Sequence, residues 1–159
     1  MMETDVKRRI LLKGSMAAGA LGVAVAAGLL TPTRVIAAWP DKAFAAKAMP
    51  DMLLELMGGE NPEESADIKI KAPDIAENGA VVPVTISTTI AGAQSIAVIA
   101  MNNPAPLVAS YDLGEGVEGF VSTRIKMGKS GDVVAVVKAD GKLYSAKKGV
   151  KVTIGGCGG

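Results

Sequence analysis

The sequence contains no histidine and only one cysteine among its 159 residues. The lack of histidine excludes Ser-His-Asp and Cys-His catalysis, His-ligated zinc or haem, and an imidazole proton shuttle. A single cysteine cannot form an intramolecular disulfide, a CxxC redox pair or a thiolate cage for a metal. We therefore expect no metal site and no catalytic machinery of its own, because only carboxylates, amines and one thiol remain.

Aromatic residues and excess charge are also scarce. The chain has one tryptophan, two tyrosines and two phenylalanines, and its formal net charge is +1. Proteins that bind nucleic acids stack bases on aromatic side chains or present a strongly basic surface. We expect no nucleic-acid partner. The length corresponds to one domain that can bury a sizeable core.

The first 38 residues differ from the rest. An uncharged run rich in alanine and glycine covers residues 14–30 and follows a basic segment that contains Lys7, Arg8, Arg9 and Lys13. A basic start, an apolar run and small residues before a change of composition are the parts of a secretory signal. We predict that residues 1–38 are a signal peptide, cleaved within residues 37–39. An uncleaved membrane anchor is the alternative, but the apolar run is short and poor in large side chains.

Arg8 and Arg9, followed by Ile-Leu-Leu-Lys, resemble the twin-arginine export motif, although Lys7 stands where that motif usually has Ser or Thr. This motif predicts a periplasmic protein with no membrane attachment after cleavage. Removal of residues 1–38 leaves twelve basic and fourteen acidic residues, so the mature net charge is −2. The near-neutral charge of the full chain is therefore largely an effect of its leader.

Residues 39–154 read as a short helical segment followed by a strand-rich domain. Asp41 is placed to cap the first helix, Pro50 to break or restart it, and Gly58-Gly59 to end it. Residues 60–65 are expected to form an acidic connecting loop. Alternation of apolar and polar residues predicts a half-buried strand over 82–90. Further short strands are expected to begin near Asp67, Gln94, Leu107, Val117, Asp132, Lys142 and Val150.

These short strands, separated by turn residues, predict an all-β antiparallel sandwich or barrel. Two segments, 96–101 and 133–137, are continuously apolar. Continuous apolar character is typical of strands that are covered on both faces, so we expect both to be central.

Three groups of residues could suggest a ligand site. Gly114, Gly116 and Gly119 fit the letters of a dinucleotide-binding GxGxxG, but a strand is expected to follow, so we predict a hairpin loop. The acidic side chains of Asp112, Glu115 and Glu118 lack the spacing of a calcium loop and indicate a solvated face. A third group contains lysines near the last strands, which we interpret as protection of a sheet edge or, alternatively, as a docking surface for an acidic partner: Lys138, Lys142, Lys147, Lys148 and Lys151.

The C-terminal residues have a different character. An alternating strand leads directly into four glycines that surround Cys157, the only cysteine: Gly155, Gly156, Gly158 and Gly159. Glycine has great conformational freedom and no side chain to bury, so residues 155–159 are predicted to be a flexible arm. A lone cysteine is most often a small buried hydrophobic residue, but four glycines cannot enclose it. We expect this thiol to enter a narrow pocket of another protein.

The segment that ends in Gly-Gly-Cys-Gly-Gly resembles the C-terminal arm of the SoxY family, the sulfur-carrier subunits of the periplasmic Sox thiosulfate-oxidation system. The segment 67–86 and the order of leader, helices, strands and arm are similar as well. The resemblance implies an immunoglobulin-like sandwich and covalent attachment of sulfur intermediates to Cys157, with no cofactor. It implies a carrier, not an enzyme.

The resemblance also implies partners. These are a SoxZ-like subunit that forms a heterodimer and is exported with the carrier, a c-type haem SoxAX-like enzyme, a SoxB-like thiosulfohydrolase and a SoxCD-like sulfane dehydrogenase. Two alternatives remain open at this point. One is a ubiquitin-like carrier with a thiocarboxylate at Gly159, and the other is a structural sandwich that forms interchain disulfides through Cys157.

Overall fold

The computed structural model describes residues 40–154, which form two short helices and nine strands. The helices are α2 (Asp41–Ala45) and α3 (Met49–Met57). The strands are β1 (Glu63–Glu64), β2 (Ile68–Lys71), β3 (Ile75–Asn78), β4 (Val82–Thr88), β5 (Ala93–Ala100), β6 (Leu107–Asp112), β7 (Phe120–Ile125), β8 (Gly131–Ala139) and β9 (Lys142–Ile154). None of the helices within this range is long and apolar enough to cross a membrane.

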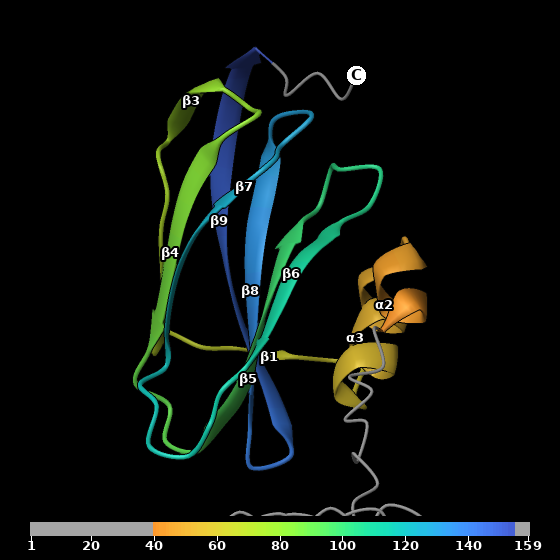
Figure 1. Cartoon of the computed structure of the whole chain (residues 1–159), viewed down its shortest axis with the longest axis vertical. Coiled ribbons are helices and arrows are strands. Elements are labelled where there is room, and N and C mark those ends of the chain that lie inside the picture. The colour runs from red at the N-terminus through yellow and green to blue at the C-terminus, as the bar shows by residue number, and fades with distance from the viewer. Residues whose placement is uncertain (1–39, 155–159) are drawn as a thin grey trace, which may run out of the picture. The chain divides into compact units, whose positions relative to one another are not determined.

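The strands form two sheets that pack face to face (Figure 1). The larger sheet has the order β1-β9-β8-β5-β6, with β3 also paired to β9, and the smaller sheet has the order β2-β4-β7. The pairs between the longer strands are antiparallel, whereas β1 and β3 lie parallel to opposite ends of β9. The predicted all-β, immunoglobulin-like sandwich is confirmed.

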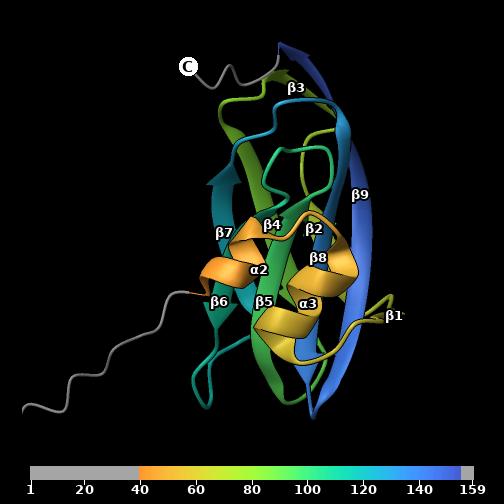
Figure 2. The same cartoon turned by 90° about the vertical axis from the view of Figure 1, so that its right-hand side faces the viewer.

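The two continuously apolar segments are central strands, as predicted. β5 lies between β8 and β6, and β8 lies between β9 and β5. Alternate residues of both strands face the smaller sheet, and the residues between them face the helices. Figure 2 shows α2 and α3 over the outer face of the larger sheet, where Met52 and Leu53 are completely buried. Both faces of these strands are thus removed from water, which explains their lack of polar residues.

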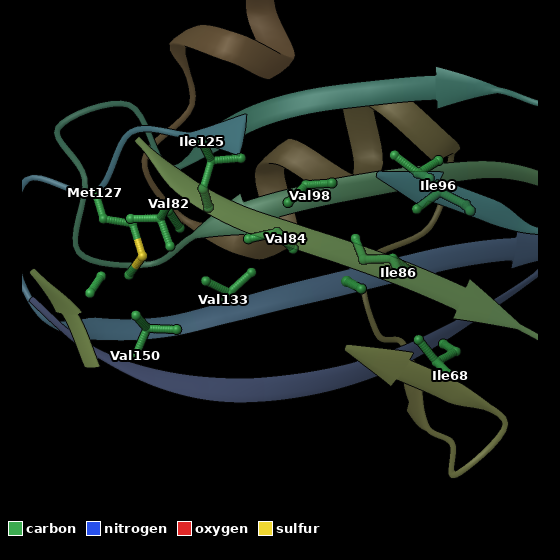
Figure 3. Close-up of a cluster of buried hydrophobic side chains, with 14 of the residues drawn as sticks. Ile68, Val82, Val84, Ile86, Ile96, Val98, Ile125, Met127, Val133 and Val150 are labelled. Carbon is green, nitrogen blue, oxygen red and sulfur yellow. The ribbon is translucent and has the colours of Figure 1, made fainter. Parts of the chain in front are cut away.

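The main core fills the space between the sheets. Figure 3 shows Val82, Val84 and Ile86 of β4 among side chains from the larger sheet. These three inward residues alternate with Pro83 and Thr85, which do not lie in the core. The alternation of β4 therefore arises because only one face of the smaller sheet is buried.

The helices begin and end for local reasons, one of which differs from expectation. Asp41 is the first residue of α2 and makes no capping bond, because the helix already starts after Pro40. Pro50 lies in the first turn of α3, where its missing N–H is not needed, so the helix restarts there as predicted. Gly58 ends α3 with φ +74° and donates its N–H to the carbonyl of Leu54.

Three expectations about strands need correction. The strands expected at Lys142 and Val150 are one continuous strand, β9, because every residue of β8 has a partner along it. β7 begins at Phe120 and not near Val117. The acidic segment between α3 and β2 was expected to be a loop, but it contains β1, which pairs with Tyr144 and Ser145 of β9.

Candidate functional site

Cys157 and the glycines Gly155, Gly156, Gly158 and Gly159 lie outside the residues that the structure describes, as do Arg8, Arg9 and the predicted signal peptide. The predictions that rest on them are therefore not tested by the structure. The structure does describe the last residues before the arm, which are those at the end of β9. We call residues 151–154 the arm root.

The arm root extends past the neighbouring strand β8. The ladder between β8 and β9 ends at the pair Gly131–Val150. Beyond this pair, β9 is accompanied by β3, which runs parallel to it with the registers Ile75–Lys151, Ala76–Val152 and Asn78–Ile154 (Figure 1). The short strand β3 therefore takes over the support of β9 where β8 ends.

Two hydroxyl groups fix the arm root further. The Val152 N–H donates to Oγ of Ser130 at 2.8 Å, and this hydroxyl donates to the Val152 carbonyl at 3.3 Å. On the side of β3, Oγ1 of Thr153 donates to the carbonyl of Glu77 at 2.9 Å and lies 3.4 Å from that of Ala76. Ser130 thus replaces the missing β8 partner, and the arm root is held from both sides.

The loops around the arm root are tied to one another. Nδ2 of Asn102 donates to the carbonyl of Ser130 at 2.7 Å. Asn103 donates to the carbonyl of Lys126 at 2.6 Å and accepts the N–H of Gly128 at 2.9 Å. The loop that carries Ser130 is therefore held by two side chains of the loop between β5 and β6. Side-chain hydrogen bonds therefore hold the loops at this end of the sandwich together, and the chain continues from here to Cys157.

The glycine-rich segment 114–119 is not a dinucleotide site, because the strand β7 follows it and no helix does. It is not a hairpin loop either, which corrects our prediction. It connects β6 in the larger sheet to β7 in the smaller sheet. The segment lines an open groove of about 440 Å³ together with residues 90–94 and Asp140.

The acidic residues of this region are spread out. Asp112, Glu115 and Glu118 are all exposed. Within residues 40–154 there is no group of three or more Cys, Asp or Glu side chains that could hold a metal ion. The groove therefore contributes no evidence for a cation site.

The five lysines near the last strands make different interactions. Lys147 and Lys148 lie on the stretch of β9 between its pairings with β1 and β3, and form ion pairs with Glu64 at 3.9 Å and Asp74 at 2.9 Å. Lys138 donates to the carbonyl of Met57, the last residue of α3, at 2.8 Å. Lys142 and Lys151 are exposed. The interpretation as edge protection fits only the lysines in the open stretch of β9.

The residues that support the arm root could not be predicted from the sequence. Ser130 lies in a Gly-Lys-Ser-Gly turn, and its type alone indicates only a turn. Thr153 belongs to the alternating C-terminal segment, where its residue type does not distinguish it from any other strand residue.

A family model described as "Sulfur oxidation protein SoxY" matches residues 53–157, a range that ends at Cys157. Among solved structures, the chain is similar to the sulfur carrier protein SoxY from Chlorobium limicola f thiosulfatophilum, with 47% sequence identity and a TM-score of 0.60. The match covers 65% of this chain and 94% of that chain.

A more distant likeness is to the superoxide reductase (neelaredoxin) from Ignicoccus hospitalis, with 22% identity and a TM-score of 0.47. It covers 54% of this chain and 79% of that chain, and it carries no functional argument. No match was found among curated proteins.

Proposed function

The chain belongs to the SoxY family of sulfur carrier proteins, and we propose that it carries the intermediates of thiosulfate oxidation as covalent adducts on Cys157. Family membership supports the role in sulfur oxidation as a carrier and not as a catalyst. The role of Cys157 rests on a different observation. It is the only thiol, and it follows the anchored strand β9 by three residues.

The proposed chemistry begins with the thiol of Cys157 and the outer sulfur of thiosulfate. A new S–S bond forms between them, the thiol loses its proton, and two electrons pass to a SoxAX-like c-type haem enzyme. A SoxB-like thiosulfohydrolase then adds water across the bond to the sulfonate group, which releases sulfate and leaves a persulfide on Cys157. A SoxCD-like sulfane dehydrogenase then accepts six electrons from the outer sulfur while three water molecules supply its oxygens and lose their protons, which gives a sulfonate on Cys157. A second hydrolysis by the thiosulfohydrolase releases this group as sulfate and regenerates the thiol. The carrier itself needs no cofactor for these steps.

The geometry of the arm suits delivery to several enzymes. The three peptide steps from Ile154 to Cys157 span roughly 10 Å when extended, at about 3.3–3.6 Å per residue. Gly155 and Gly156 add no side chains to this length, so the sulfur could enter a narrow channel. The hydrogen bonds of Ser130 and Thr153 fix the point from which this length is measured. A fixed arm root and an arm without side chains before Cys157 together favour insertion of the thiol into a pocket.

The proposal includes a location and a permanent partner. Residues 1–38 direct the chain through the twin-arginine route to the periplasm, where the enzymes above act. This route exports folded proteins, which allows a SoxZ-like subunit without a leader to travel as part of a heterodimer. The mature carrier has no attachment to the membrane.

The test is complementation of a host strain that lacks this gene. We expect wild-type protein to restore thiosulfate-dependent oxygen uptake and Cys157→Ser to restore none, with equal amounts of both proteins in the periplasm. Activity of Cys157→Ser would contradict the proposal and favour a thiocarboxylate at Gly159. Loss of activity in Cys157→Ser together with an obligatory, reductant-sensitive dimer of the wild-type protein would instead favour the structural disulfide.

A further inference from the structure

Exposed cationic side chains gather at the end of the sandwich that holds the arm root. Arg124 lies near the end of β7, and Lys126 and Lys129 lie in the loop between β7 and β8. Lys129 directly precedes Ser130, whose hydroxyl binds Val152. Lys151 is the first residue of the arm root. Within residues 40–154 none of these four cations forms an ion pair.

The same end exposes apolar side chains. Val81, in the turn between β3 and β4, is 54% exposed, and Met101, at the start of the loop between β5 and β6, is 39% exposed. Both turns border the arm root, because Asn78 pairs with Ile154 and the Met101 N–H donates to the carbonyl of Asp132. Apolar residues surrounded by charged ones are typical of protein–protein interfaces.

The opposite end of the sandwich has the opposite charge. The loops between β6 and β7 and between β8 and β9 meet there around the groove of about 440 Å³. Four exposed acidic side chains lie there and outnumber the one exposed cation of these loops, Lys142 at the start of β9: Asp112, Glu115, Glu118 and Asp140. The arm end is not free of acids, since Glu77, Asp132 and Asp74 are exposed there, but the four cations outnumber them, and Asp74 already forms an ion pair with Lys148. The domain therefore carries a charge separation along its length, although its mature net charge is small.

We propose that the arm end, defined by Arg124, Lys126, Lys129, Lys151, Val81 and Met101, is a docking surface for the enzymes that act on Cys157. We propose further that these enzymes present acidic side chains around the entrance to their active-site channel. Long-range attraction would then orient the carrier with its arm toward the channel before contact, while the acidic end is repelled. This inference rests on the proposed carrier function and adds the chemistry of the surface that recognises it.

The test uses charge reversals that change the net charge equally at the two ends. The arm-end variant is Lys129→Glu with Lys151→Glu, and the control is Lys69→Glu with Lys142→Glu, whose exposed lysines lie away from the arm root. The probe is the c-type haem enzyme of the same host that joins thiosulfate to the carrier, with the full mature chain and its SoxZ-like partner. The second-order rate constant is measured at several ionic strengths.

We expect the arm-end variant to react about tenfold more slowly at low ionic strength, within the range of electrostatic steering, and to lose most of the salt dependence. In the control variant, the rate constant at low ionic strength and its salt dependence should both stay within about twofold of wild type. The reaction of Cys157 with the neutral disulfide 2,2′-dithiodipyridine should be equal in all three proteins, which shows that the thiol itself is unchanged.

Equal rate constants for the two variants would overturn the docking proposal while leaving the carrier function intact. So would a faster reaction of the arm-end variant, which would mean that the enzyme entrance is basic. The arm-end variant could also react more slowly because it no longer forms the heterodimer or no longer self-associates. This result would overturn the docking proposal, since the surface would then be a contact between subunits. Failure of wild-type protein to accept thiosulfate at all would instead contradict the proposed function.

Discussion

The hydrogen bonds of Ser130 predict that a single hydroxyl controls how firmly the arm root is held. Ser130→Ala removes both the 2.8 Å bond from the Val152 N–H and the 3.3 Å bond to the Val152 carbonyl. No strand replaces them on this side, because the ladder with β8 ends at Gly131. Water can reach the released groups, since Ser130 is exposed. We therefore expect a loss of about 1 kcal/mol in the free energy of local opening, within the usual range for a hydrogen bond.

The assay is amide hydrogen exchange of Val152 under native conditions. A loss of about 1 kcal/mol corresponds to roughly fivefold faster exchange, since about 1.4 kcal/mol is a factor of ten. Adding Thr153→Val removes the bonds to the carbonyls of Glu77 and Ala76 and should raise the factor to roughly thirtyfold if the two losses add. Amides in the middle of β8 should exchange as in wild type.

A matched control is Ser122→Ala, which removes another exposed hydroxyl, that of a residue within β7. Oγ of Ser122 lies 3.2 Å from Oγ1 of Thr85, on the smaller sheet and away from β9. This variant should leave the exchange of Val152 unchanged. If Ser130→Ala also left it unchanged, the account of the arm root as an anchored platform would be refuted.

Two further predictions concern the packing of the helices against the larger sheet, and both are measured by urea unfolding. Leu53→Ala should lower the free energy of unfolding by about 2–5 kcal/mol, because the side chain is completely buried between α3 and the sheet; a loss below about 1 kcal/mol would contradict this packing. Lys138→Met keeps most of the aliphatic stem but removes the donor to the Met57 carbonyl, and should cost about 1 kcal/mol. Unchanged stability of Lys138→Met would mean that water serves the end of α3 equally well.

The central strands could be predicted because their environment leaves a direct trace in the sequence. Residues 96–101 and 133–137 contain no charged residue, and the structure covers both faces of these strands. Gly58 and Pro50 mark the limits of α3 for reasons that depend only on local backbone geometry. Such features are visible without knowledge of the fold.

The short strands β1 and β3 could not be predicted in the same way. Neither has an apolar alternation of useful length: β1 is Glu63–Glu64, and in β3 only Ala76 is buried. They are strands because β9 offers unpaired backbone groups at its two ends. Their formation therefore depends on a partner that lies far away along the chain.

The candidate site, like the fold, could be predicted only in part. The composition of residues 155–159 singled out Cys157 at once, because a lone cysteine among four glycines has few structural explanations. The support of the arm root by Ser130 was not visible, since it depends on the point at which β8 stops and β9 continues. The cationic end could not be predicted either, because Arg124 in β7 and Lys151 in β9 come to the same end of the sandwich only in the folded chain.

The proposed carrier function depends on the attachment of sulfur intermediates to Cys157. The most direct measurement is intact mass spectrometry, with peptide mapping, of mature protein taken from cells during thiosulfate oxidation and kept free of reductants. We expect a mass increase equal to a thiosulfate or persulfide adduct, located on the peptide that contains Cys157 and removed by a reducing agent. An unmodified Cys157 throughout turnover would contradict it.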